Sequence, residues 1–425
     1  MKKFWFLFYN LLIVPILYLG VRIIGFYNSK VMRGIKGRRR IFEELIINSA
    51  AIRKANKLIW FHSSSLGEFE QAKPIIEELK KNKGINILVT FYSPSGYDNS
   101  RKYPFADLVS YLPFDTKANA AKFIQIVKPN LSVLMRYDLW PNHIWAMKSF
   151  NIPIFLVDAT MKENSRRKFL FMKNFHKYLF MDVTKILTVS KSDAEGFKDF
   201  GCTDNQVKAV GDTRFDRVYQ RSLTASAHNL LKTDLFKGKK ILVAGSTWEA
   251  DEEVILPAFS KLAKNDDDVI LIIAPHEPTV VHLEKIENEF SGDLDTIRFS
   301  FMNNYKSERV IIIDSIGILL TLYTYADAAY VGGSFKQGIH NVLEAAVYGV
   351  PVLFGPKIDN SQEAKELLKQ GGGILIRNKK EAYRNLRMLF INEMMRKEKG
   401  DISYNYVQKN LGATEKILKE INQAL

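Results

Sequence analysis

The first hydrophobic feature of the chain is an uncharged run, "FWFLFYNLLIVPILYLGV", from Phe4 to Val21. Its length is close to the roughly 20 residues that a membrane-spanning helix needs. A basic stretch beginning at Arg22 follows it, and no small-residue cleavage site is present, which favours an uncleaved anchor over a signal peptide. An interfacial helix is the alternative. Because the cations after the run outnumber Lys2 and Lys3 before it, the positive-inside rule predicts a cytoplasmic main body.

After the basic stretch, short apolar runs bounded by turn residues alternate with longer segments that carry apolar residues at helical spacing. The first series of expected strands is "LIWFHS", "INILVTFYS", "LVSYLP", "LSVLM", "PIFLVDA" and "KILTVS". The second series, after the break at "DRVYQRSLTASAHNLLKTDLFKGKK", is "ILVAGS", "VILIIAP", "RVIIIDS", "AAYVGGS", "PVLFGP" and "GILIR". Continuous apolar strands are typical of parallel sheets that helices cover on both faces. The pattern therefore predicts two α/β domains.

Ligands of such sheets bind beyond the carboxyl ends of the strands, so the cleft between the two domains is the expected site. The expected segments are a membrane anchor (1–27), a basic juxtamembrane segment (28–57), a first sheet domain (58–215), a linker (216–238), a second sheet domain (239–402) and a C-terminal helix (403–425).

Composition agrees with this division and narrows the functional classes. A chain of 425 residues with 47% hydrophobic residues can bury two cores. The formal charge of +15 could serve nucleic acid, an anionic membrane or an acidic substrate. Much of that charge is juxtamembrane or interleaved with acids, which disfavours nucleic-acid binding. A single cysteine, Cys202, excludes an internal disulfide and a multi-cysteine metal site.

One candidate catalytic group is Glu68, in "FHSSSLGEFE" after the first expected strand. The small residues and Gly67 are expected to let the backbone turn before a helix that begins near Glu68. One interpretation is a helix-start carboxylate, stabilised there by the helix dipole. The other is a general base that faces the cleft, with a pKa raised by burial.

A second candidate is the segment from residue 330 to 356, "YVGGSFKQGIHNVLEAAVYGVPVLFGP", in which a strand leads into a glycine-rich loop. A helix is expected to open near His340 or Asn341, so that its free N–H groups face a phosphate. Glu344, in the first turn of that helix, would reach a ribose hydroxyl. A plain strand-to-helix turn is the alternative. The glycine spacing fits neither a Walker nor a dinucleotide-binding motif.

Other loops add polar candidates at the same level of the sheets. Ser246 and Thr247 lie at the end of a strand of the second series, and the alternative interpretation is that they cap a helix. His276 lies at the end of the next strand, and the alternative interpretation is a surface histidine. The acidic run "NDDDV" precedes a strand, so we interpret it as a solvated turn and not as a metal site. In "RYDLWPNHIWAMK" we interpret the two tryptophans as packing residues.

In their order, "HSSSLGEFEQAKPII", "MRYDLWPN", "GDTRFDRV", "VAGSTWEADEEVIL" and "YVGGSFKQGIHNVLEAAVYGVPVLFGP" resemble the motifs of the 3-deoxy-D-manno-octulosonic acid (Kdo) transferases of lipopolysaccharide assembly. The resemblance runs from the membrane segment to about residue 400. It implies a GT-B glycosyltransferase, with two Rossmann-like domains and an interdomain cleft, on the cytoplasmic face of the inner membrane. It also implies inverting transfer of Kdo from CMP-Kdo to a lipid A precursor of the lipid IVA type, without a metal or other cofactor and without nucleic acid.

The resemblance also assigns roles to residues. Glu68 occupies the position of the family's general base. The acceptor side would include Ser65, Gly67, Arg136 and Asp138. The nucleotide side would include Ser246, Thr247, His276, Gly338, His340, Asn341 and Glu344.

Three positions depart from the family pattern. "PHEP" stands where many members have "PRHPE", so the family's arginine beside His276 is missing. Ile339 replaces a glycine in a loop that is one residue shorter than usual. Arg136 stands where a glutamate is common, with Asp138 at the second acidic position.

Two other functions remain as alternatives at this stage. A GT-B transferase that uses a UDP-sugar on a lipid would show a similar phosphate loop, and its nucleotide preference would distinguish it. A membrane-tethered nucleic-acid binder would need basic residues clustered with exposed aromatic side chains.

Overall fold

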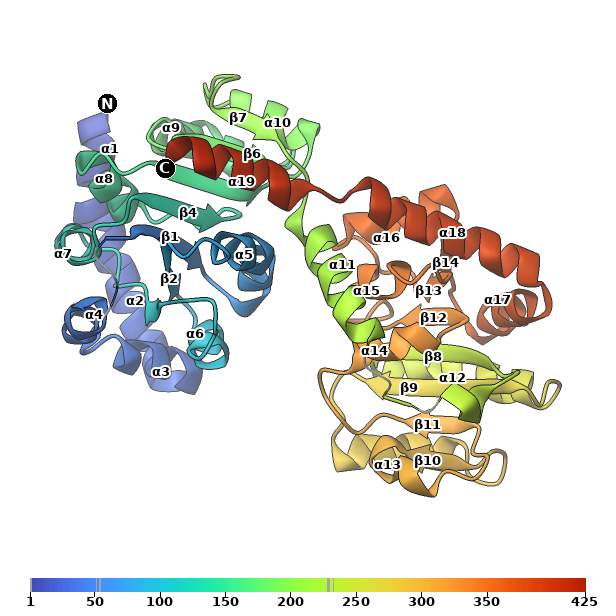
Figure 1. The fold of residues 1–425 in the computed structure, drawn as a ribbon. Helices are drawn as coiled ribbons and strands as arrows, with labels where there is room; N and C mark the ends of the chain where they lie inside the picture. Colours follow the sequence, from blue (N-terminus) through green and yellow to red (C-terminus); the bar gives the residue numbers. More distant parts are fainter. Residues whose placement is uncertain (1, 51, 53–54, 228–229, 232) are drawn as a thin grey trace. The chain divides into compact units, whose positions relative to one another are not determined.

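A computed structural model describes residues 2–50, 52, 55–227, 230–231 and 233–425, and Figure 1 shows its fold. Parts of the expected juxtamembrane segment and linker therefore lie outside the described residues. The chain forms two compact units: Met1–Arg217 with Leu411–Leu425, and Val218–Asn410. We refer to these as unit 1 and unit 2.

Unit 1 contains a seven-stranded parallel sheet in the order β3-β2-β1-β4-β5-β6-β7. Its strands are β1 (Lys57–Ser63), β2 (Ile85–Phe91), β3 (Leu108–Tyr111), β4 (Leu131–Met135), β5 (Ile154–Ala159), β6 (Lys185–Thr188) and β7 (Val207–Ala209). The helices after the N-terminal segment are α5 (Leu66–Leu79), α6 (Pro94–Ser100), α7 (Lys117–Val127), α8 (Pro141–Ser149), α9 (Leu170–Phe180), α10 (Lys191–Lys198) and α11 (Thr213–Ser226), with α19 (Ala413–Ala424) from the end of the chain.

Helices cover both faces of this sheet, and the burial of β1 shows the consequence. Leu58 and Trp60 join the hydrophobic core on one face, while Ile59 and Phe61 join the core on the other. A strand buried on both sides needs a continuous apolar sequence, which is why "LIWFHS" could be recognised.

Unit 2 contains a second seven-stranded parallel sheet, in the order β10-β11-β9-β8-β12-β13-β14. Its strands are β8 (Lys240–Thr247), β9 (Val269–Pro275), β10 (Thr296–Arg298), β11 (Val310–Ile312), β12 (Ala328–Val331), β13 (Val352–Phe354) and β14 (Gly373–Leu375). Its helices are α12 (Glu249–Ala263), α13 (Val280–Glu289), α14 (Leu319–Leu322), α15 (Leu343–Ala346), α16 (Gln362–Gln370), α17 (Lys379–Ile391) and α18 (Glu393–Lys409).

The prediction of two Rossmann-like parallel-sheet domains is confirmed. In each sheet the strand order reverses beside the first strand of the unit, β1 with neighbours β2 and β4, and β8 with neighbours β9 and β12. Ligands of doubly wound sheets bind at such switch points, outside the carboxyl ends of the strands. The loops after β1, β4, β8 and β12 are thus the places to look for chemistry.

The C-terminal segment differs from the single last helix that we expected. Helix α18 ends at Lys409, and α19 begins at Ala413. Gly412 between them has φ +96, a left-handed conformation that a glycine adopts at little cost. The bond from Gly412 N to Asp216 Oδ1, at 2.8 Å, then fixes the start of α19 on unit 1. In the expected linker, the structure has α11 and a 3-10 turn at Thr233–Phe236.

The apolar N-terminal run forms a helix from Lys2 to Tyr27, with mean hydropathy 2.0 in its most apolar window. It consists of α1 (Lys2–Phe8), a π-helical segment η1 (Tyr9–Ile13) and α2 (Val14–Tyr27), and α3 (Ser29–Gly37) and α4 (Ile41–Ala50) follow. Its length and composition suit a membrane span.

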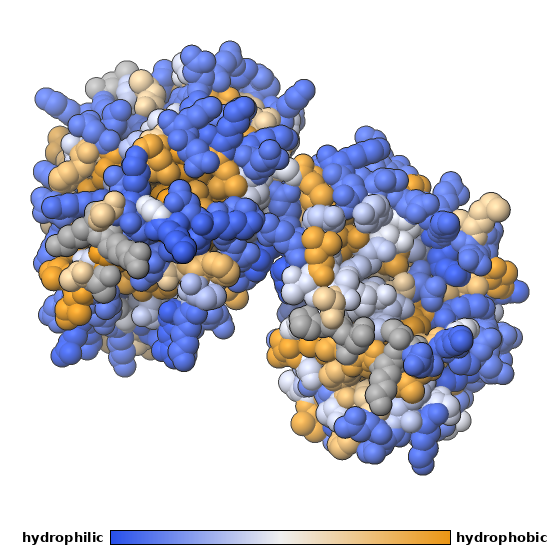
Figure 2. All heavy atoms as spheres, viewed as in Figure 1, coloured by the Kyte–Doolittle hydropathy of each residue, from blue (hydrophilic) through white to orange (hydrophobic). Residues whose placement is uncertain are grey.

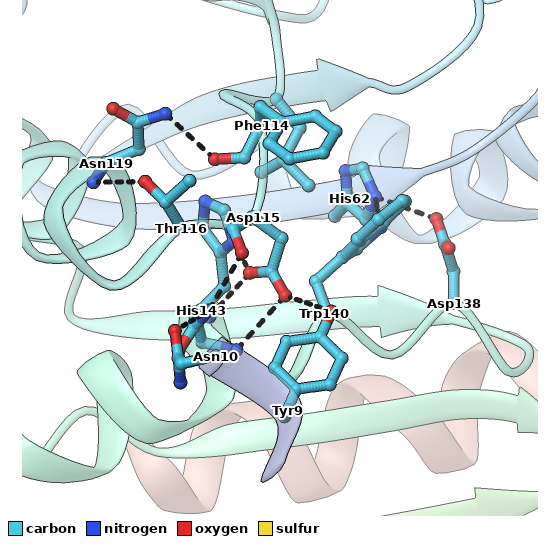
Figure 3. A network of polar contacts seen from close by, with 12 residues as sticks. Tyr9, Asn10, His62, Phe114, Asp115, Thr116, Asn119, Asp138, Trp140 and His143 are labelled. Atoms are coloured by element: carbon cyan, nitrogen blue, oxygen red, sulfur yellow. Dashed lines mark hydrogen bonds and ion pairs between the residues drawn. The ribbon is translucent and has the colours of Figure 1, made fainter. Parts of the chain in front are cut away.

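One side of this helix is joined to the sheet domain of unit 1 by polar contacts (Figure 3). The hydroxyl of Tyr9 donates to Oδ2 of Asp115 at 2.8 Å, and Asn10 and Asn142 exchange amide hydrogen bonds of 3.0 Å. Lys2 Nζ pairs with Asp182 Oδ1 at 2.7 Å. The opposite side is apolar and exposed, including Leu7, Leu11, Leu12, Ile16 and Leu19.

Polar residues cover much of the visible face of both units in Figure 2, with patches of apolar residues between them.

Candidate active site

The loop after β1 carries Glu68 at the start of α5. Ser65 is the N-cap residue of this helix, and its backbone N–H donates to Oε2 of Glu68 at 3.1 Å. In return, Glu68 N–H points to Ser65 Oγ at a longer 3.5 Å. The two contacts form a capping box, which satisfies N–H groups that the first helical turn leaves unpaired. Glu68 therefore caps the start of α5, as the first of the two interpretations from the sequence expects.

Gly67 does not have the role that the sequence suggested. Helix α5 begins at Leu66, so Gly67 lies inside its first turn, and Gly67 is absent from the residues with positive φ. A Cβ atom at this position would meet no atom within 4 Å. The expected sharp turn at Gly67 is therefore wrong, and the residue leaves open space next to Glu68.

The surroundings of Glu68 shift its ionisation. Partial burial raises the pKa of Glu68, and the nearby charge of Asp138 raises it further. Backbone hydrogen bonds from Ser65 and Ser64 and the charge of His62 act in the opposite direction but are weaker. A half-buried carboxyl group with a raised pKa holds a proton more readily than a free glutamate, which suits a group that must accept one.

Asp138, from the loop after β4, forms a network with β1 (Figure 3). Its Oδ2 atom lies 2.7 Å from Nε2 of His62 and also accepts a hydrogen bond from the hydroxyl of Ser64. The indole N–H of Trp140 also donates to the carboxylate of Asp138, and its nitrogen lies 3.1 Å from Nε2 of His62. Burial opposes ionisation of Asp138, but the charge of His62 and these hydrogen bonds outweigh it, so the pKa of Asp138 is below its usual range.

Arg136 stands at the end of β4 in a left-handed conformation, with φ +60. Its Nε atom donates to Oε1 of Gln71 at 3.0 Å, one helical turn after Glu68. The four residues expected on the acceptor side, Ser65, Gly67, Arg136 and Asp138, thus all lie around the first turns of α5.

In unit 2, the loops after β8 and β12 approach each other closely. A Cβ atom on Gly332 would lie 2.2 Å from the carbonyl oxygen of Ser246, so only glycine fits there. Ser246 itself has φ +54, at a register shift of β8. The carboxylate of Asp251 accepts from Gly333 N at 2.8 Å and from the hydroxyl of Tyr330 at 2.6 Å, which holds the glycine-rich loop in place.

An aromatic stack brings three loops of unit 2 together. The ring of His276 stacks on His340 with centroids 4.5 Å apart and on Trp248 at 4.7 Å. The indole N–H of Trp248 donates to Nε2 of His340 at 3.0 Å. Since an indole N–H can only donate, Nε2 is the acceptor and the proton of neutral His340 lies on Nδ1. Burial, with the charge of His276, lowers the pKa of His340 and favours this neutral form.

The helix expected near His340 begins at Leu343 and has one turn, four residues long. Glu344 lies in that turn, as expected, and its carboxylate lies 3.8 Å from Arg221 Nη1. The side chain of Asn341 is exposed and donates to Glu344 Oε1 at 3.4 Å. Because so short a helix sums few peptide dipoles, the macrodipole contributes less to anion binding here than we expected.

Two other nucleotide-side candidates occupy different surroundings. Gly338 has φ +105, and a Cβ atom there would lie 3.0 Å from Oδ1 of Asn360, which accepts from Ile339 N at 3.1 Å. Thr247 is fully buried, and its hydroxyl donates to Oε1 of Glu252 at 2.7 Å. Gly338 thus shapes the loop, whereas the hydroxyl of Thr247 is engaged inside the unit.

The acidic run between α12 and β9 pairs with cations. Asp266 contacts Lys240 at 2.8 Å, Asp268 contacts Lys239 at 2.8 Å, and Asp267 contacts Arg309 at 3.1 Å. Within the described ranges, no group of three His, Cys, Asp or Glu side chains is arranged to hold a metal ion.

Sequence reasoning did not select His62 or Trp248 and treated Trp140 as a packing residue. His62 was counted as part of the buried strand β1. Trp248 directly follows "GST" and precedes the first residue of α12, where the serine and threonine were the candidates. Position at the carboxyl end of a strand was the one signal that could have singled them out.

Comparisons with known proteins agree with these motifs. The sequence profile described as 3-Deoxy-D-manno-octulosonic-acid transferase (kdotransferase) matches residues 38–217. A 3-deoxy-D-manno-octulosonic acid transferase of Aquifex aeolicus is 31% identical over 343 residues, which cover 80% of this chain and 88% of that protein.

Two further matches give less specific information. A bifunctional glycosyltransferase/methyltransferase of Fusobacterium nucleatum is 29% identical over 77% of this chain, and the match spans about half of that protein, 52%. The solved structure of UDP-GlcNAc 2-epimerase from Neisseria meningitidis bound to UDP-GlcNAc has a TM-score of 0.62 at 14% identity, covering 86% of this chain and 100% of that one. This last likeness concerns the fold alone.

Proposed function

The chain belongs to the 3-deoxy-D-manno-octulosonic acid (Kdo) transferase family, and we propose that it moves Kdo from CMP-Kdo to a lipid A precursor of the lipid IVA type, with Glu68 as general base. As a member of this family, it is a glycosyltransferase that transfers Kdo in lipopolysaccharide biosynthesis. The observation that carries the mechanistic proposal is the position of Glu68 at the carboxyl end of β1, partly buried beside the charge of Asp138.

In this mechanism the ionised carboxylate of Glu68 takes the proton from an acceptor hydroxyl. The hydroxyl oxygen then attacks the anomeric carbon of Kdo, and CMP leaves with the electrons of the broken bond on its phosphate. Attack on the side opposite to CMP inverts the configuration at that carbon. The raised pKa of Glu68 supports this role, because a base works best with a pKa near the operating pH.

On the donor side, the loops around His276 and His340 are the proposed nucleotide site. The Nδ1–H of His340 is the proposed donor to a phosphate oxygen. The same loops and the short helix α15 contain the other proposed nucleotide-side residues, Ser246, Gly338, Asn341 and Glu344. The hydroxyl of Thr247 is bonded to Glu252, so we propose that Thr247 holds the loop after β8 in place and does not contact the nucleotide itself.

The arginine that is usual beside His276 in the family pattern is missing here. We propose that Lys336 supplies the positive charge instead. Lys336 and Trp248 line one hollow of about 290 Å³ in unit 2, together with Lys285. Lys285 is paired with Glu249 at 2.6 Å, whereas Lys336 is exposed on the glycine-rich loop. A cation at this point would stabilise the charge that develops on the departing phosphate.

We also propose that the N-terminal helix attaches the enzyme to the cytoplasmic face of the inner membrane. Its outward side carries exposed Leu and Ile side chains, which favours contact with lipid. Its inward side is bonded to unit 1 through Tyr9 and Asn10, so lipid would surround the helix on one side only.

The direct test is transfer of Kdo from CMP-Kdo to a tetraacylated lipid A precursor by the full-length protein in detergent, followed by mass spectrometry. The proposal predicts addition of Kdo in the presence of EDTA, and thermal protection by CMP but not by UDP. Protection by UDP alone, with no Kdo product, would favour a UDP-sugar transferase instead.

A further inference from the structure

Unit 1 contains an apolar cavity of about 760 Å³ that the mechanism above does not use. Its walls come from the end of α2, from α3 and the start of α4, and from the loops after β2 and β3. The apolar lining includes Val21, Ile24, Val31, Ile35 and Phe114. Its volume falls within the range of about 300 to 1,000 Å³ that is usual for small-molecule sites.

The charged residues around this cavity all have the same sign. Among the described residues that line it, the charged ones are Arg22, Lys30, Arg38 and Arg39. An apolar interior with a purely basic border is complementary to a molecule that has a hydrocarbon part and an anionic group.

Arg38 is the most enclosed of these cations. Its guanidinium donates to the carbonyl oxygens of Leu112 at 2.8 Å, Gly34 at 2.8 Å and Tyr92 at 2.6 Å. These bonds use three of the five N–H groups of a guanidinium, and no described carboxylate pairs with it. The guanidinium also lies over the rings of Tyr92 and Tyr111, with Cζ 4.6 and 4.9 Å from their centroids. Its charge is thus held by neutral groups alone, and an anionic ligand would supply the opposite charge.

One wall of the cavity is hydrogen-bonded to the loop that leads to Glu68. Tyr92 and Ser93 line it, and the ring of Tyr92 stacks on Trp140 with centroids 4.5 Å apart. Ser93 N–H donates to the carbonyl oxygen of Ser64 at 2.9 Å, in the loop between β1 and α5. The wall formed by Tyr92 and Ser93 is thus bonded to the segment that precedes the proposed base in unit 1.

The entrance also suits a ligand that arrives from a membrane. Ile24 is 53% exposed and Phe26 is 79% exposed, and both line the cavity at the end of the helix that we expect to contact lipid. A lipid could enter from that side without crossing water.

We infer that this cavity binds an acyl chain of the lipid acceptor and that its basic border, with Arg39 and Arg38, contacts an acceptor phosphate. The inference rests on the proposed function and adds a lipid-binding subsite to it. Burial of each acyl methylene contributes about a fourfold gain in affinity, so chain length is the property that the cavity should sense.

The test compares two acceptors that differ only in acyl-chain length, using the full-length protein in one detergent. For each variant we measure the ratio of the KM for the short-chain acceptor to the KM for the long-chain acceptor. Val31→Trp fills the cavity and should bring this ratio close to one, with the KM for CMP-Kdo unchanged. Ile23→Trp, at an exposed position of the preceding helix α2 and outside the cavity lining, should keep the wild-type ratio.

A second variant does not depend on repacking. Arg39→Gln at the exposed border should raise the KM for the phosphorylated acceptor about tenfold and leave a dephosphorylated acceptor unaffected. Equal ratios in wild type, Val31→Trp and Ile23→Trp would overturn the inference. So would a Val31→Trp protein that loses binding to anionic phospholipid vesicles while its acceptor KM values stay unchanged, because the cavity would then hold bilayer lipid. Absence of Kdo transfer by the wild type to either acceptor would instead contradict the proposed function.

Discussion

Asp138 and the buried His62 form a close pair, with Oδ2 of Asp138 2.7 Å from Nε2 of His62. The pair has opposite effects on the neighbouring Glu68, because the charge of Asp138 raises the pKa of Glu68 whereas the charge of His62 lowers it. The ionisation of Glu68, which follows β1, thus depends on the carboxylate of Asp138, which lies in the loop after β4.

This dependence predicts the effect of Asp138→Asn on the pH profile of transfer. The ionised form of Glu68 is the active one, so activity rises as pH rises through its pKa. Removing the negative charge at position 138 lowers that pKa, and the acid limb of kcat against pH should move to lower pH. Asp98→Asn, at an exposed pair with Arg33, is the matched control and should leave the limb in place. A limb that moves to higher pH in Asp138→Asn would contradict this account of Glu68.

A donor-side prediction concerns Lys336→Gln. Loss of a charge-assisted contact to phosphate should raise the KM for CMP-Kdo about tenfold, the equivalent of about 1.4 kcal/mol. Lys365→Gln removes a similar lysine from a surface pair with Asp359 and should leave this KM unchanged. Initial rates at varied CMP-Kdo concentration measure both. If the two variants behave alike, Lys336 does not replace the missing arginine.

The attachment of the N-terminal helix can be measured through Tyr9→Phe. This change leaves the packing and removes a buried hydrogen bond to the carboxylate of Asp115, which also accepts from the backbone N–H groups of Asn142 and His143. Hydrogen bonds to charged groups contribute about 1.5 to 3 kcal/mol, so the free energy of unfolding should fall by roughly that amount. Tyr27→Phe, at a side chain 90% exposed, should have no effect in the same denaturation assay. Equal stability of both variants would show that this bond does not fix the helix on the sheet domain of unit 1.

The sheets were predictable because their strands are buried on both faces. All strands expected from apolar runs are present, including β11 ("VII") with only three residues. In contrast, β7 ("VKA") and β10 ("TIR") were missed, because their polar residues leave no continuous apolar run. The position of Glu68 in the first turn of α5 was also predictable, from the cap residue Ser65 before it.

Contacts between distant residues could not be predicted in this way. Tyr9 and Asp115 are 106 positions apart, and nothing in the apolar run indicated that its helix would be bonded to the sheet domain. The same holds for the hydrogen bond from Trp248 to His340, which selects the tautomer of the histidine. Such pairings depend on how the loops meet in three dimensions.

The most direct test of the central claim is the kcat of Kdo transfer by Glu68→Gln, with Glu70→Gln as the control. Glutamine can keep the capping contact to Ser65 N–H, so a loss of activity would not come from an uncapped helix. Glu70 lies on the same helix and pairs instead with Lys73 and Arg217.

The account predicts that Glu68→Gln loses about 10² to 10⁴ in kcat, the usual contribution of a general base, while its KM for CMP-Kdo and its unfolding temperature stay close to wild type. Glu70→Gln should retain most of the kcat. A Glu68→Gln protein that transfers Kdo at nearly the wild-type rate would show that Glu68 caps a helix and does not act as the base.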